Sequence, residues 1–151
     1  MTSQFDFSND DWEQLTATPA LVGYAVARAE DSGFLGSIRE TRTLVSTIAD
    51  GTDHGPARSL IEAAAAADPK ETLARHGAAA PDALAHSAVM ACEELVRILA
   101  ATAQPDESAD FRRWVLEVAT TVAEAAREHG VLVSSGEAAV IDRVRTALQL
   151  G

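Results

Sequence analysis

The sequence predicts an all-α protein, a single domain over residues 1–151 that folds as a compact bundle of about seven helices. Apolar residues recur three and four positions apart through most of the chain, which is the period of a helix face. No stretch alternates apolar and polar residues for long enough to form a strand. Hydrophobic residues make up 47% of the sequence but aromatic residues only 5%, so the core must be built from Ala, Leu, Val and Ile, which suits close-packed helices.

The first two predicted helices are separated by a proline. Ser8, with Asp11 three residues later, is typical of the cap that opens a helix over about residues 9–16. Thr18 and Pro19 form a second start signal, and the proline is expected to break or kink the chain there. The next helix should end at the turn-forming run 31–33, and one of its faces carries Leu21, Val22, Ala25, Val26 and Ala29.

The middle of the chain predicts two further helices with a turn between them. One is expected over about residues 35–49, with Leu35, Ile38, Val45 and Ile48 facing inward. The run 50–55 is typical of a turn, and Pro56 opens a helix that should continue to Ala67. Residues 70–76 could add a short helical turn.

Three long helical patterns occupy the rest of the chain. The first opens at Pro81, and its apolar stripe consists of Leu84, Ala88, Cys92, Leu95 and Leu99. The second opens at Pro105 and repeats the period at Phe111, Val115, Val118, Val122 and Ala125. The last, over about residues 135–149, should bury Ile141, Val144 and Leu148.

A nine-residue pattern occurs twice, over residues 32–40 and 129–137. The copies share Gly, Leu, Ser and Glu at matching positions. Each pattern is a helix stopped by Gly, a short apolar link, and a Ser followed three residues later by the Glu that completes a capping box for the next helix. We call each such link a corner. The pattern therefore predicts two similar helix–corner–helix units, from an internal duplication or from the same corner chemistry used twice.

The net charge of the chain argues against some classes of binding partner. The formal net charge is −11, and the 12 Lys and Arg are dispersed among 23 Asp and Glu, which argues against binding nucleic acid or an anionic membrane surface. One cysteine excludes an intrachain disulfide and fits a reducing compartment. The first residues lack the features of a signal peptide, and no apolar run approaches the roughly 20 residues of a membrane span. These observations predict a cytoplasmic protein.

No catalytic constellation is evident in the sequence. Cys92 belongs to an apolar stripe and is expected to be a packed, inert thiol. None of the histidines lies three or four residues from another, as a helical metal site would require; they are His54, His76, His86 and His129. The run that begins at Asp50 resembles a calcium loop only in composition, because Thr52 and Ile61 occupy its third and twelfth positions.

Two sets of residues remain as candidate sites. Acids stand at both corners and could hold a divalent cation if the corners face each other, or they could simply cap helices and face solvent; they are Glu30, Asp31, Glu40, Glu128 and Glu137. A second set lies opposite the core stripe of its helix and would form a partner surface if exposed; it consists of His86, Met90, Glu93 and Arg97. Trp114, next to Arg112 and Arg113, fits either a surface patch or the core.

The run 130–137, together with Ile141, Val144 and the closing Leu148-Gln149-Leu150-Gly151, resembles the end of TerB-like proteins, an all-helical family associated with tellurite resistance. Residues 31–40 are similar to the same family pattern, an acidic-Gly corner, an apolar link, Ser, and a Glu that opens a helix with a Leu-Gly-Leu-type ending. The resemblance implies an all-helical fold. It also nominates Asp31, Glu40 and Glu137 as metal ligands, because the corner acids of that family are proposed to bind metal. The second corner departs from the pattern, with Glu128-His129-Gly130 where Asp-Gly is more usual.

The sequence thus predicts a non-enzymatic helical interaction or stress-response domain similar to TerB, with a protein partner or self-association. The alternative is a divalent-cation-binding protein that uses the corner acids. The two hypotheses differ in what they require: an exposed Met or Trp patch for the first, and carboxylates that converge for the second.

Overall fold

The computed structural model describes residues 2–29, 55–66, 80–128 and 135–150. In these residues the chain is helical and contains no strand, which confirms the all-α prediction. The elements are a single 3-10 turn, η1 (Gln4–Asp6), and the helices α1 (Asn9–Ala29), α3 (Arg58–Ala66), α5 (Pro81–Thr102), α6 (Pro105–Glu128) and α7 (Ser135–Ala147). The helix expected over 35–49, the turn expected over 70–76 and the link residues of both corners lie outside the described residues.

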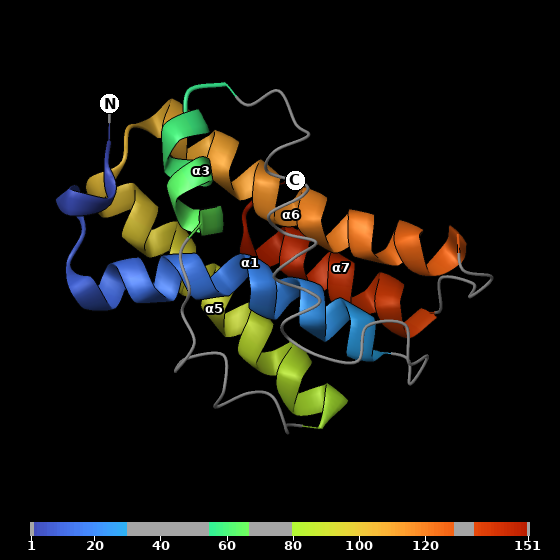
Figure 1. The fold of residues 1–151 in the computed structure, drawn as a ribbon. Coiled ribbons are helices and arrows are strands. Elements are labelled where there is room, and N and C mark those ends of the chain that lie inside the picture. The colour runs from blue at the N-terminus through green and yellow to red at the C-terminus, as the bar shows by residue number, and fades with distance from the viewer. Residues whose placement is uncertain (1, 30–54, 67–79, 129–134, 151) are drawn as a thin grey trace.

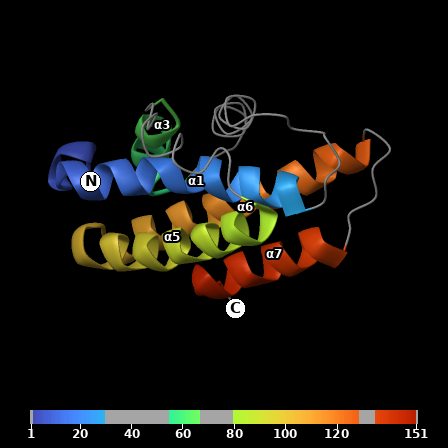
Figure 2. The same cartoon turned by 90° about the horizontal axis from the view of Figure 1, so that it is seen from below.

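Helix α1 is the central element of the bundle. It packs against α5, α6, α7 and α3; Figure 1 shows it crossing α5, and Figure 2 shows it lying lengthwise beside α5. The run from Leu15 to Ala27 is buried at every position and contains no charged residue. A helix that is apolar all round is one that neighbours surround, so α1 fills the middle of the bundle rather than presenting a single apolar face.

Of the break or kink expected at Pro19, the break is wrong, because α1 continues through this residue from Asn9 to Ala29. A proline inside a helix removes one backbone hydrogen bond and crowds the preceding turn. Here two threonine hydroxyls contribute hydrogen bonds to that turn: Thr16 donates to the Glu13 carbonyl at 3.0 Å and Thr18 to the Gln14 carbonyl at 2.7 Å. Pro19 is itself buried, so packing on all sides favours the continuous helix.

The start signals expected at Ser8, Pro81 and Pro105 are confirmed, whereas α3 begins at Arg58, two residues after the expected start at Pro56. The Ser8 hydroxyl accepts a hydrogen bond from the Asp11 backbone N–H at 3.1 Å, which caps α1. Pro81 and Pro105 are the first residues of α5 and α6, where the missing N–H of proline costs nothing.

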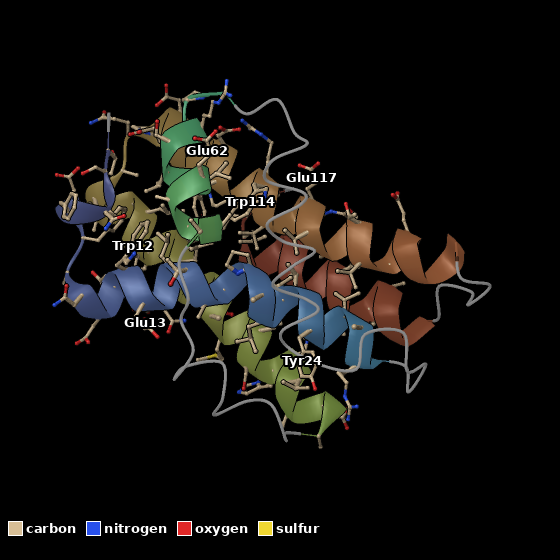
Figure 3. All side chains as sticks on the ribbon, in the orientation of Figure 1. Trp12, Glu13, Tyr24, Glu62, Trp114 and Glu117 are labelled. Atoms are coloured by element: carbon tan, nitrogen blue, oxygen red, sulfur yellow. The ribbon has the colours of Figure 1, made fainter. Side chains whose placement is uncertain are left out.

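The core contains apolar side chains from all five described helices. The stripe predicted for α5 is buried throughout, and so are the residues of α6 from Phe111 to Val122 that carry its period. Trp114 is 1% exposed and makes an edge-to-face contact with Phe111, with ring centroids 5.3 Å apart, so it belongs to the core (Figure 3). No described helix combines the length and apolar character that a membrane span requires.

Three polar contacts from α6 fasten the ends of the bundle. At its start, the buried Glu107 carboxylate accepts hydrogen bonds from the Thr2 backbone N–H at 2.9 Å and the Thr2 hydroxyl at 2.6 Å. One turn later, Asp110 accepts a hydrogen bond from the Ala57 backbone N–H at 2.9 Å, which ties down the start of α3. Arg112 donates to the Leu148 carbonyl at 2.9 Å and so binds the end of α7.

Candidate functional site

None of the three residues predicted to be metal ligands has a side chain among those that the structure describes. Asp31 and Glu40 lie outside the described residues, and for Glu137 only the backbone position within α7 is described. Among the residues that the structure does describe, no group of three His, Cys, Asp or Glu side chains could hold a metal ion. The cation hypothesis therefore stays a prediction.

The thiol of Cys92 faces the core, as its place in the apolar stripe predicts. It is 0% exposed. Burial, with a smaller contribution from the negative charge of Glu93, raises the pKa of Cys92 to about 12. The thiol is thus protonated at neutral pH and unsuited to nucleophilic attack. Of the four histidines, His86 is exposed on α5, and the other three lie outside the described residues.

The most distinctive surface feature is a groove of about 540 Å³ between α1 and α5. We call it the acidic groove. Its residues are Asp10, Asp11, Gln14, Ala17, Thr18 and Leu21 of α1, and His86, Ser87, Met90, Ala91 and Glu94 of α5. The two helices run in opposite directions, so the start of α1 lies beside the later turns of α5 (Figure 2). This pairing brings Asp10 and Asp11 to the same end of the groove as Glu94.

The floor of the acidic groove is made of small and apolar groups. Ala17, Leu21 and Ala91 are each no more than 5% exposed, and the Thr18 hydroxyl is bonded to its own helix. Met90, by contrast, stands 52% exposed at the side of the groove. A half-exposed methionine next to a small apolar floor is a surface that can accommodate differently shaped partners, because its side chain is unbranched and adaptable.

The electrostatics of the groove are one-sided. Its three carboxylates, Asp10, Asp11 and Glu94, face no Lys or Arg among the lining residues. Arg97, one turn beyond Glu94, bonds to it through two guanidinium nitrogens, one of them at 3.0 Å. This hydrogen bond lowers the pKa of Glu94 and outweighs the slight opposing effect of burial, so that Glu94 stays ionised. The groove therefore presents negative charge across neutral pH.

A second groove, of about 560 Å³, lies between α5 and α7. It carries charges of both signs, with Glu93 and Asp142 beside Arg143. Asp142 is also paired with Arg145 of its own helix at 3.3 Å. Because its charges are mixed and its lining has no exposed large apolar side chain, this groove favours no particular class of partner.

The exposed stripe predicted on α5 is confirmed, but the structure divides it. His86, Met90, Glu93 and Arg97 are all exposed. Met90 and His86 line the acidic groove, whereas Glu93 lines the groove on the α7 side. The contribution of Asp10 and Asp11 was missed, because their sequence signal is that of ordinary acids in the first turn of a helix, and only the packing of α1 on α5 places them opposite Glu94.

The aromatic residues near the N-terminus differ in their exposure to solvent. Phe7 is buried and its ring centroid lies 5.8 Å from that of Trp12, which is partly buried near the start of α1 (Figure 3). Phe5 is 87% exposed. Phe5, Phe7 and Trp12 line neither groove, so they do not extend the apolar surface of the acidic groove.

Comparison with protein-family models, with curated proteins and with solved structures gives no match for this chain. The resemblance to TerB-like proteins therefore rests on the residues that carry it, and the functional interpretation rests on the geometry of the acidic groove.

Proposed function

We propose that this protein is a non-enzymatic helical interaction domain with a role in stress response, similar to TerB-like proteins, and that the acidic groove is its docking surface. The observation that carries the proposal is the 52% exposure of Met90 beside a floor of small apolar residues. Among the described residues, the other large apolar side chain with such exposure is Phe5, which lines neither groove. Together, Met90 and this floor form an apolar strip in a groove between two helices, against which the apolar face of a partner helix can dock.

The backbone at the end of α7 is compatible with the ending that the family resemblance implies. Gln149 stands at the middle position of the Leu148-Gln149-Leu150 ending, where TerB-like proteins are expected to have Gly. Its φ is 58°, in the left-handed region that glycine favours. The backbone of this ending is thus one that a Leu-Gly-Leu sequence would adopt with less strain.

A complementation experiment in the source organism tests both parts of the proposal. We expect deletion of the gene to lower growth on tellurite and the wild-type gene to restore it. Met90→Glu should fail to restore growth, because a charge at the groove opposes apolar docking. Ala100→Glu is the matched control, since Ala100 is exposed on the same helix but lines neither groove, and it should restore growth.

Each arm can contradict a different claim. If deletion leaves tellurite tolerance unchanged, the proposed stress role is wrong. If Met90→Glu accumulates normally and restores growth as well as Ala100→Glu does, the acidic groove is not the docking surface. Circular dichroism of both purified variants shows whether the helical fold is retained.

The cation-binding alternative is tested by a separate experiment. A site formed by Asp31, Glu40 and Glu137 would raise the melting temperature on addition of its ion, and saturation at 100 times Kd corresponds to about 2.7 kcal/mol. The measurement is a thermal melt with Mg²⁺, Ca²⁺, Mn²⁺ and Zn²⁺, repeated on the triple variant Asp31→Asn, Glu40→Gln, Glu137→Gln. No rise across the four ions eliminates the alternative, whereas a rise that the triple variant abolishes favours it over the interaction domain.

A further inference from the structure

We infer that the partner of the acidic groove is a basic amphipathic helix of another protein, with Lys or Arg clustered at one end of a small apolar face. This inference rests on the proposed function and deepens it by naming the chemistry of the partner. It follows from the charge of the groove, from its shape and from the charge of the whole chain.

The charge of the groove selects a cationic partner. Asp10, Asp11 and Glu94 gather at the end formed by the start of α1 and the later turns of α5, and no lining residue there is a Lys or Arg. Arg97 compensates Glu94 from outside the groove and is itself exposed. A cationic side chain that docks at this end gains from Asp10 directly and shares Glu94 and Asp11 with Arg97, which interacts with both of these carboxylates.

The shape of the groove selects a helix. Its residues on α1 run from Asp10 to Leu21, which at 1.5 Å per residue is about 16 Å, or roughly three turns. The floor toward the Leu21 end is apolar and small, with Met90 at its side. A docked helix of three turns would place apolar residues at spacings of three and four on Ala17, Leu21 and Met90, and basic residues one or two turns away against the aspartates.

The charge of the whole chain disfavours the other occupants. A second copy would bring another net charge of −11 to a surface that is already acidic, and like charges across an interface oppose association. Nucleic acid and anionic membranes are repelled for the same reason. A basic segment of a different protein is the occupant that the field of this chain attracts.

The test is a selection from a displayed library of 18-residue amphipathic helices with randomised polar positions. Binders to the wild-type protein are retained and then depleted on the Met90→Glu variant, so that only groove-dependent helices remain. We expect these helices to be enriched in Lys and Arg at one end relative to the unselected library. Groove-dependent helices with no such enrichment, or no groove-dependent helices at all, would overturn the inference.

The affinity of the best selected peptide, synthesised and measured by calorimetry, then tests the residues. Asp10→Asn, Asp11→Asn and Glu94→Gln combined should weaken binding by roughly tenfold, whereas Arg97→Gln should strengthen it by roughly threefold, since it removes repulsion and releases Glu94. The matched control removes three exposed acids from other faces, Glu62→Gln, Glu124→Gln and Asp142→Asn, and should change the affinity by less than about twofold. Equal weakening by the groove and control variants would show that net charge alone attracts the peptide, and would overturn the inference.

Failure of this inference can be told apart from failure of the proposed function. If growth on tellurite depends on Met90 but the selected helices are not basic, the docking surface stands and the partner chemistry is wrong. If sedimentation shows a dimer of the wild-type chain that Met90→Glu dissociates, the occupant is a second copy and this inference is wrong. If the gene is dispensable on tellurite while basic helices bind the groove, the stress role alone fails.

Discussion

Gln149 ends α7 in a backbone conformation that few residues other than glycine adopt. Its φ is 58°. The Gln149 backbone N–H donates to the Thr146 carbonyl at 3.0 Å, and the Leu150 backbone N–H donates to the Arg145 carbonyl at 3.1 Å. This pair of hydrogen bonds is the Schellman motif, in which the left-handed position is the one that glycine most often occupies. The motif therefore forms here at the expense of strain at a single residue.

The strain at Gln149 predicts a stabilising substitution. Gln149→Gly should raise the free energy of unfolding by roughly 0.5–1 kcal/mol, because relief of the left-handed strain exceeds the greater chain entropy of glycine in the unfolded state. Urea denaturation measures the change. Gln149→Ala is the control and should give no gain, since alanine has the same Cβ clash. A glycine variant no more stable than the wild type would contradict the interpretation.

Glu107 is the residue whose ionisation should matter most for stability. Burial tends to raise its pKa, but the hydrogen bonds that its carboxylate accepts from Thr2 and from the Gln104 backbone N–H outweigh burial, so the pKa lies below the ordinary value of 4.5. A group whose pKa is lowered by folding stabilises the protein above its unfolded pKa, and that contribution is lost as the pH falls through the folded pKa. The N-terminal segment should thus detach in acid.

Substitution of Glu107 tests this dependence. Glu107→Gln should cost about 2 kcal/mol at pH 7, because the hydrogen bonds from Thr2 lose their charged acceptor. The difference from the wild type should be full above about pH 5. It should shrink below pH 4.5, where the unfolded wild-type carboxyl takes up a proton, and disappear below the lower folded pKa, where the folded carboxylate is protonated too. Urea denaturation from pH 3 to pH 7 measures both proteins. A difference that stays constant across this range would show that the carboxylate charge is not the cause.

Among the elements, α3 is the least extensively packed of the described helices, and its attachment depends on one carboxylate. Asp110 of α6 accepts the hydrogen bond from the Ala57 backbone N–H at the start of α3. A Cβ at Gly55 would stand 3.7 Å from the same carboxylate, so the chain passes close to Asp110 on entering the helix. The apolar side of the attachment is formed by Leu60, Ile61 and Ala64, all buried.

Removal of the Asp110 carboxylate should loosen α3 without unfolding the bundle. We expect Asp110→Ala to cost about 1 kcal/mol and to speed amide hydrogen exchange over residues 57–66, while α5 and α6 keep their protection. Arg113→Ala is the control: Arg113 contacts Asp110 only at 3.8 Å and is largely exposed, so its loss should leave exchange unchanged. Uniform acceleration in all helices would instead indicate that Asp110 supports the global fold.

The helices could be predicted because their signals are local. Ser8, Pro81 and Pro105 open helices by capping chemistry that involves only the next few residues, and the stripe from Leu84 to Leu99 is a periodicity within one segment. The chain does not break at Pro19 because packing outweighs the local rule. The informative signal was the absence of any charge from Leu15 to Ala27, which marks a helix surrounded by others.

At the scale of the whole molecule, the candidate site could be predicted only in part. The exposure of Met90 follows from its position opposite the core stripe of α5, and the sequence contains that information. The acidic groove could not be predicted from the sequence. It exists only when the start of α1 lies against the later turns of α5, which brings Asp10 and Asp11 close to Glu94. Which helices become neighbours depends on the burial of the whole bundle, and no spacing along the chain encodes it.

The excess of acids predicts how the stability of the whole chain responds to salt. Four ion pairs among the described residues are short-range contacts within one helix and are worth little in water: Arg58–Glu62, Glu94–Arg97, Asp110–Arg113 and Asp142–Arg145. The net charge of −11 is therefore left to act mainly as self-repulsion of the folded state. Screening by salt weakens repulsion between exposed charges beyond about 10 Å at 0.1 M.

A rise in NaCl from about 10 to 200 mM should therefore raise the melting temperature, by about 3 °C for a domain of this length. The variant with Glu62→Gln, Glu124→Gln and Asp142→Asn carries less repulsion, so it should show a smaller rise and a higher melting temperature at low salt. Arg145→Gln changes the charge in the opposite direction and should show a larger rise. A melting temperature that falls with salt would mean that attractive pairs outweigh the repulsion, and the acidity would then serve the fold itself as well as the field around the acidic groove.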